Sequence, residues 1–72
     1  MDIYYTNKTL YVNLTDEINP LVIEHMQKRV FNILDDYEIG NIELIVGECD
    51  NNLFNNFITT YKSKYNGNLK IK

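Results

Sequence analysis

Two side chains of this chain could act as a nucleophile or bind a transition metal: the single histidine, His25, and the single cysteine, Cys49. A zinc site needs several such ligands at fixed spacings, and none is spaced to join His25. Cys49 stands between Glu48 and Asp50, whose negative charges oppose formation of a reactive thiolate. The sequence therefore predicts a solvated helix position for His25, a half-buried loop position for Cys49, and no metal site.

Acid–base catalysis would need a pair of carboxyl groups held in a cleft that separates their pKa values. Two pairs are close in sequence, Asp35 with Asp36 and Glu48 with Asp50, but nothing around either pair indicates a substrate pocket. The three glycines are too isolated for a phosphate-binding loop or a dinucleotide fingerprint. We predict that the chain is not an enzyme and that it holds no cofactor.

The overall composition limits the class of protein further. A chain of 72 residues is long enough for one small domain, which we place at residues 1–72. A net charge of −3 with scattered basic residues suits phosphate backbones poorly, so we expect no nucleic-acid partner. A single cysteine forms no intramolecular disulfide, and no apolar run is as long as a signal peptide or a membrane span requires. We expect a cytoplasmic protein that does not associate with membranes.

The elements that position these residues follow from hydrophobic spacing. Residues 2–5 and 9–14 are β-prone and flank a short polar turn, which predicts a hairpin with Leu10, Val12 and Leu14 on one face. Asn19 and Pro20 then form a helix-start signal, and Gly40 is expected to end that helix in a left-handed conformation. The buried stripe of the helix is expected to contain Ile23, Met26, Val30, Ile33, Leu34 and Tyr37.

In the second half of the chain the hydrophobic period changes from two to 3.6. Residues 41–46 alternate as a buried strand does, and a polar loop leads to a second helix whose first turn Asp50, Asn51 or Asn52 can cap. Residues 66–68 should end that helix before a short last strand at 69–71. The core of the second helix is expected to contain Phe54, Phe57 and Tyr61, with Tyr65 reaching the surface.

The predicted fold class is α/β, with the element order β-β-α-β-α-β. Right-handed crossovers would place two helices on one face of a mixed, mostly parallel four-stranded sheet. The opposite face is then uncovered and carries Tyr11, Asn13, Glu43, Ile45 and Lys70. Because parallel sheets are usually covered on both faces, this face is a candidate for partner docking or self-association.

This pattern resembles the STAS domain of bacterial anti-sigma-factor antagonists. The resemblance rests on the element order, on the acidic turn at residues 14–19 before a long helix, and on residues 42–47 followed by an Asp-headed helix. In that family an Asp-Ser-Ser-Gly motif caps the second helix, and the second serine is phosphorylated by a partner kinase. Further matching positions are Phe57, Ile58, Tyr61, Lys62 and residues 66–69.

The resemblance implies a partner-binding site at the start of the second helix. Asp50 matches the motif aspartate, Asn51 and Asn52 stand where the family has serines, and Leu53 stands at the glycine. An asparagine amide takes no phosphoryl group, so the regulatory charge cannot be added. The loop before Asp50 is shorter than in the family, and the family's last helix is missing from the sequence.

Two functions from different classes follow. The first is a regulatory protein–protein interaction module, similar to an anti-sigma-factor antagonist that cannot be phosphorylated, whose partner resembles an anti-sigma-factor kinase domain. Its binding residues would be Asp50, Asn51, Asn52 and Leu53. The alternative is a small structural homo-oligomer, for example a homodimer, that assembles through the uncovered sheet face.

Overall fold

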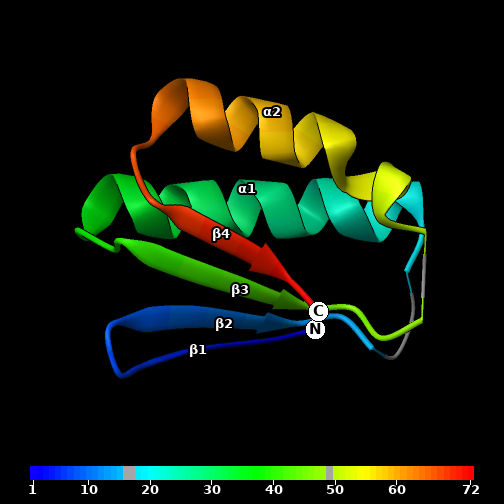
Figure 1. Ribbon diagram of the computed structural model, residues 1–72, viewed down its shortest axis with the longest axis horizontal. Coiled ribbons are helices and arrows are strands. Elements are labelled where there is room, and N and C mark those ends of the chain that lie inside the picture. The colour runs from blue at the N-terminus through cyan, green and yellow to red at the C-terminus, as the bar shows by residue number, and fades with distance from the viewer. Residues whose placement is uncertain (16–17, 49) are drawn as a thin grey trace.

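The computed structural model describes residues 1–15, 18–48 and 50–72, and forms a small α/β domain with a four-stranded mixed sheet and two helices (Figure 1). The fold class predicted from the sequence is confirmed at this level. A short 3-10 helix, η1, precedes the second α-helix. In chain order the elements are β1 (Asp2–Thr6), β2 (Thr9–Asn13), α1 (Pro20–Asp36), β3 (Asn41–Ile45), η1 (Asn51–Phe54), α2 (Asn55–Lys64) and β4 (Asn68–Ile71).

The strands lie side by side in the order β1-β2-β3-β4, so the first and last strands form the two edges of the sheet. The hairpin pair β1 and β2 is antiparallel, and the other two pairs are parallel. Asn7 and Lys8 join the hairpin with φ angles of 51° and 61°, the left-handed pair of a type I′ turn. Both α-helices cover the same face of the sheet (Figure 1).

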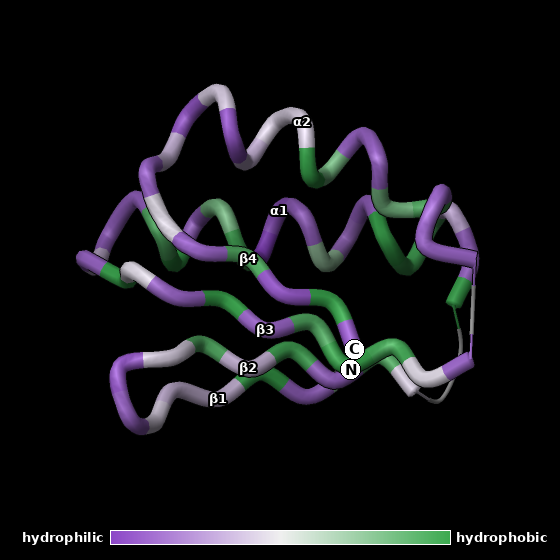
Figure 2. Tube along the Cα trace, in the orientation of Figure 1, coloured by the Kyte–Doolittle hydropathy of each residue, from purple (hydrophilic) through white to green (hydrophobic). Residues whose placement is uncertain are grey.

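The core lies between the sheet and the helices, and hydrophobic residues alternate with polar ones along the strands that supply it (Figure 2). The alternation predicted for the second and third strands is confirmed, because every second residue there is buried. The aromatic residues expected in the second helix are also buried. The buried core consists of Leu10, Val12, Leu14, Ile23, Met26, Val30, Leu34, Ile42, Leu44, Val46, Phe54, Phe57 and Tyr61.

The first helix begins as predicted but ends earlier. The Asn19 side chain accepts a hydrogen bond from the Val22 N–H at 3.0 Å, and Pro20 occupies the first turn. The expected left-handed stop at Gly40 is wrong, because α1 already ends at Asp36 and Gly40 does not have a positive φ. Tyr37 is extended and 67% exposed, so its expected place in the buried stripe is also wrong.

The start of the second helix differs from the prediction as well. Asp50 caps the 3-10 helix, whereas α2 begins only at Asn55 and has no side-chain cap of its own. The tighter first turn satisfies amides that an α-helix would leave without a partner. Cys49, for which a half-buried loop position was expected, lies outside the described residues, as do Asp16 and Glu17 of the acidic turn.

The approach to β4 depends on Gly67. A Cβ atom at this position would collide with the Tyr61 hydroxyl and would lie 2.6 Å from the Gly40 carbonyl oxygen. The Asn68 N–H donates to the same Gly40 oxygen at 2.8 Å, which fixes the start of the strand against the loop before β3. Only a residue without a side chain allows the two segments to approach this closely.

Candidate partner-binding site

The four residues that the sequence singled out lie together at the start of η1. The Asp50 carboxylate accepts a hydrogen bond from the Asn52 N–H at 2.9 Å, and the Leu53 N–H donates to the Asp50 carbonyl oxygen at 3.1 Å. This cap satisfies amides of the first turn. Asp50, Asn51, Asn52 and Leu53 are all exposed. The segment is thus capped and accessible.

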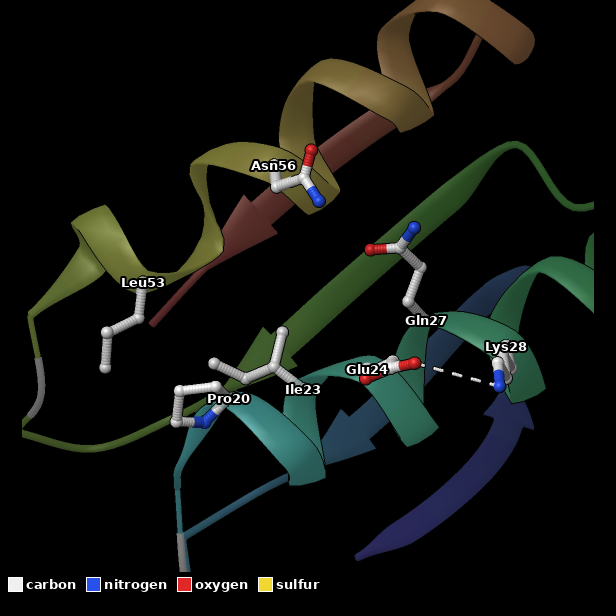
Figure 3. A pocket seen from close by; sticks show the side chains of 7 residues that line it. All are labelled: Pro20, Ile23, Glu24, Gln27, Lys28, Leu53 and Asn56. Atoms are coloured by element: carbon white, nitrogen blue, oxygen red, sulfur yellow. Dashed lines mark ion pairs between the residues drawn. The ribbon is translucent and has the colours of Figure 1, made fainter.

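A groove lies beside this segment, between the first half of α1 and the η1–α2 region (Figure 3). Its volume is about 530 Å³. Leu53 is 44% exposed and lines the groove opposite Pro20 and Ile23. The lining residues are Pro20, Ile23, Glu24, Gln27, Lys28, Leu53 and Asn56. The groove therefore combines an apolar part at one end with amide and charged groups along its length.

The charges in the groove belong to one ion pair. The Lys28 Nζ lies 3.8 Å from the Glu24 Oε1, one helical turn apart, and both side chains are largely exposed. Such a surface pair contributes about 0.3–0.5 kcal/mol, so either group can exchange this contact for one with a ligand at little cost. Gln27 and Asn56 add amide donors and acceptors to the same surface. The arrangement suits a polypeptide ligand that presents an apolar side chain beside polar groups.

The groove residues on α1 were not predicted from the sequence as part of a binding site. Pro20, Glu24, Gln27 and Lys28 recur at helical spacing, a signal that they share one face of the helix. That signal does not reveal which element lies opposite. Only the packing of η1 and the first turn of α2 beside this face brings Leu53 and Asn56 to it.

The second predicted site is the sheet face opposite the helices. The strand register places Tyr11 beside Glu43 and Asn13 beside Ile45, and all four side chains are half-buried. The Lys72 Nζ lies 3.3 Å from the Glu43 Oε1, and the ring of Tyr4 stacks on that of Tyr11 with centroids 5.1 Å apart. This open sheet face is thus separate from the groove, which lies in the helix layer.

Of the residues considered for catalysis, the structure describes His25, Asp35, Asp36, Glu48 and Asp50 but not Cys49. His25 is exposed on α1, and among the described residues no three histidine, cysteine, aspartate or glutamate side chains are grouped as metal ligands would be. Asp35 has a structural role instead, because its Oδ1 accepts a hydrogen bond from the Tyr65 hydroxyl at 2.7 Å. This hydrogen bond raises the pKa of Tyr65 to about 12, with smaller contributions from burial and from the Asp35 charge.

No described helix has both the length and the apolar character needed to cross a bilayer. Comparisons with protein-family models, with curated proteins and with solved structures found no match to this chain.

Proposed function

We propose that this chain is a non-enzymatic protein–protein interaction module with a STAS-like fold, and that it regulates a protein partner by binding it. The observation that carries the proposal is the exposed, capped segment Asp50, Asn51, Asn52 and Leu53 at the rim of a groove. The element order β-β-α-β-α-β and the position of this segment at the start of the second helical region support the resemblance to anti-sigma-factor antagonists.

The partner that the resemblance suggests is an anti-sigma-factor kinase domain. Leu53 and Ile23 offer it an apolar contact, and the Asn52 side chain stands where the family presents its phosphorylatable serine. Because asparagine cannot be phosphorylated, the module would stay in its binding form at all times.

The test is a calorimetric titration of the purified protein with an anti-sigma-factor kinase domain. We expect Asn52→Trp to weaken binding by at least about tenfold, or ~1.4 kcal/mol, because a bulky ring would obstruct the docking surface. The matched control is Asn32→Trp, which changes an exposed asparagine on α1 and should leave the affinity unchanged. Equal affinities for the Asn52→Trp protein and the original protein would contradict the site.

A second variant examines the lost phosphoswitch. Asn52→Ser restores the hydroxyl, and we expect the kinase domain to transfer the γ-phosphoryl group of ATP to it, whereas the original protein incorporates none. Phosphate incorporation is measured by the mass of the intact protein. Binding without incorporation into the Asn52→Ser variant would keep the interaction site but contradict the resemblance to the phosphorylated family.

A second candidate function is a structural homo-oligomer that assembles through the open sheet face. The observation in its favour is that Tyr11 and Asn13 of β2 and Glu43 and Ile45 of β3 are partly exposed. Both α-helices cover the other face of the sheet (Figure 1). The substitution Ile45→Lys would place a charge in that interface and should therefore weaken the assembly. A mass that does not change with concentration in the original protein would contradict this function.

A further inference from the structure

The edge strand β1 borders an apolar groove that neither described α-helix fills. The groove has a volume of about 460 Å³ and lies between β1, the end of α1 and the loop that follows it. Tyr5 is 53% exposed at its rim, and Tyr37 is 67% exposed on the helix side. The lining residues are Ile3, Tyr4, Tyr5, Leu10, Ile33, Tyr37, Glu38 and Ile39. Half-exposed aromatic side chains thus gather where the sheet has a free edge.

The backbone of β1 has hydrogen-bonding groups directed away from the sheet. The Leu14 N–H, one residue after β2, donates to the Ile45 carbonyl oxygen at 2.8 Å. The even-numbered residues of β2 therefore direct their backbone N–H and C=O groups toward β3. The backbone groups of the odd-numbered residues of β2 then face β1, where Tyr11 is opposite Tyr4 and Thr9 is opposite Thr6. In an antiparallel ladder this leaves Ile3 and Tyr5 with their N–H and C=O groups pointing outward.

The side chains of this edge do not oppose pairing. Natural edges are usually protected by lysine, proline or a bulge, and the sequence from Ile3 to Thr6 has no charge and no proline. The charged residues nearest this stretch are Asp2 at one end and Lys8 at the other. If a second copy of β1 paired antiparallel, Asp2 of one copy would lie at the same end of the paired strands as Lys8 of the other. In a parallel pair, Asp2 would lie beside Asp2 and Lys8 beside Lys8.

We propose that two copies of this chain pair antiparallel through β1, about a two-fold axis at Tyr4, and join their sheets into one. The Ile3 N–H donates to the Tyr5 carbonyl oxygen of the second copy, and the Tyr5 N–H donates to its Ile3 carbonyl oxygen, because these groups point outward in both copies. Ile3 then lies beside Tyr5 of the second copy over the apolar groove. On the open sheet face, Tyr4 meets its own equivalent and extends the Tyr4–Tyr11 stack.

This pairing is independent of the proposed function, because it uses neither the groove beside Leu53 nor the centre of the open sheet face. It also differs from assembly through that face, in which Ile45 and Glu43 would be covered. A symmetric edge pair closes on itself and stops at two copies.

The test is sedimentation of the full chain over concentrations from about 1 µM to about 1 mM, the range in which modest interfaces dissociate. We expect a monomer–dimer equilibrium that Tyr5→Lys weakens by at least about tenfold, since a lysine charge is a natural block to edge pairing. The matched control is Leu21→Lys, which changes an apolar residue of similar exposure, 63%, on α1. It should leave the equilibrium unchanged.

Backbone N-methylation keeps the test independent of side-chain effects. A synthetic chain methylated at the Tyr5 amide loses an outward donor but keeps the hairpin, and it should be monomeric. Methylation at Ile71, whose amide points away from β3 on the other edge, should leave the dimer intact. A monomer at every concentration, or a dimer that Ile45→Lys disrupts and Tyr5→Lys does not, would overturn the proposal.

Discussion

The two edges of the sheet, β1 and β4, carry different side chains. Lys70 of β4 and Lys72 directly after the strand place cations at alternate positions, and Lys72 pairs with Glu43 of the neighbouring strand. Along β1, the residues after Asp2 are the uncharged Ile3, Tyr4, Tyr5 and Thr6, and both tyrosines are at least half exposed. The two strands have similar lengths and similar free backbone groups, so the difference lies in their side chains.

This difference shows where the chain restricts association. Lysine at alternate positions discourages strand addition because a docking strand would have to desolvate each charge. The β4 edge also depends on close packing at Gly67 against Tyr61 of α2, whereas the core side of β1 is left with a groove. We infer that β4 is the protected, anchored edge of the domain and β1 its available edge.

The largest effect is expected where β4 is anchored. Gly67→Ala should lower the free energy of unfolding by about 2–3 kcal/mol, because the added Cβ collides with the Tyr61 hydroxyl and the Gly40 carbonyl oxygen. Urea unfolding followed by circular dichroism measures the loss. The matched control is Gly40→Ala, whose Cβ would have no heavy atom within 4 Å. Equal stabilities for the two variants would show that the β4 edge is not anchored here.

A smaller effect, opposite in sign, is expected in the hairpin at the other edge. Lys8 has a φ of 61°, a left-handed conformation that costs a non-glycine residue about 1–2 kcal/mol. Lys8→Gly should therefore raise the free energy of unfolding by about 1 kcal/mol and still weaken the proposed dimer, since the cation that meets Asp2 is removed. Urea unfolding and sedimentation measure the two effects separately.

Asn7→Gly is the control for this pair of effects, because it relaxes the neighbouring turn position and keeps the charge of Lys8. Its gain in stability should be smaller, since asparagine tolerates the left-handed region better than lysine does. If Lys8→Gly strengthened the dimer together with the fold, the assignment of Lys8 to the interface would be wrong.

The last effect is confined to alkaline pH and concerns the hydrogen bond between Tyr65, which caps the end of α2, and Asp35 of α1. The pKa of Tyr65 is raised from 10.0 to about 12, chiefly by its hydrogen bond to Asp35. Because the pKa of Tyr65 is higher in the folded chain than in the unfolded chain, its protonated hydroxyl contributes to stability. This contribution is fully present below pH 10 and is lost as the pH rises through about 12. Stability measured by urea unfolding should thus fall between these values, and Tyr65→Phe should make the fall shallower.

Burial also raises the pKa of Tyr61, so part of the alkaline loss should persist in the Tyr65→Phe protein. An identical pH dependence in the two proteins would mean that the Tyr65 hydroxyl does not depend on Asp35 in solution.

Much of the fold could be predicted from periodicity. Alternation fixed the core face of β2 and β3, and the Asn19–Pro20 pair located the start of α1, because these signals are local. The end of α1 could not be placed in the same way. Residue type predicts a stop at Gly40 because glycine favours left-handed caps, but α1 ends at Asp36, where Tyr37 follows in an extended conformation.

The binding surfaces were predictable only in part. Asp50 was recognisable as a cap from its residue type, and Tyr11 and Ile45 as residues of one face from the strand period. The groove beside Leu53 depends on how η1 packs near α1, which no local pattern specifies. The available β1 edge likewise follows from strand order and register, which are tertiary properties.

Amide hydrogen exchange tests the difference between the two edges most directly. The exchange rates of Ile3 and Tyr5 should be compared at about 10 µM and about 1 mM protein, with Tyr4 and Thr6 as hairpin references and Ile71 as the reference on β4. We expect Ile3 and Tyr5 to become protected only at the higher concentration, while the reference amides do not change. Unchanged exchange at Ile3 and Tyr5 across this range would contradict an available β1 edge.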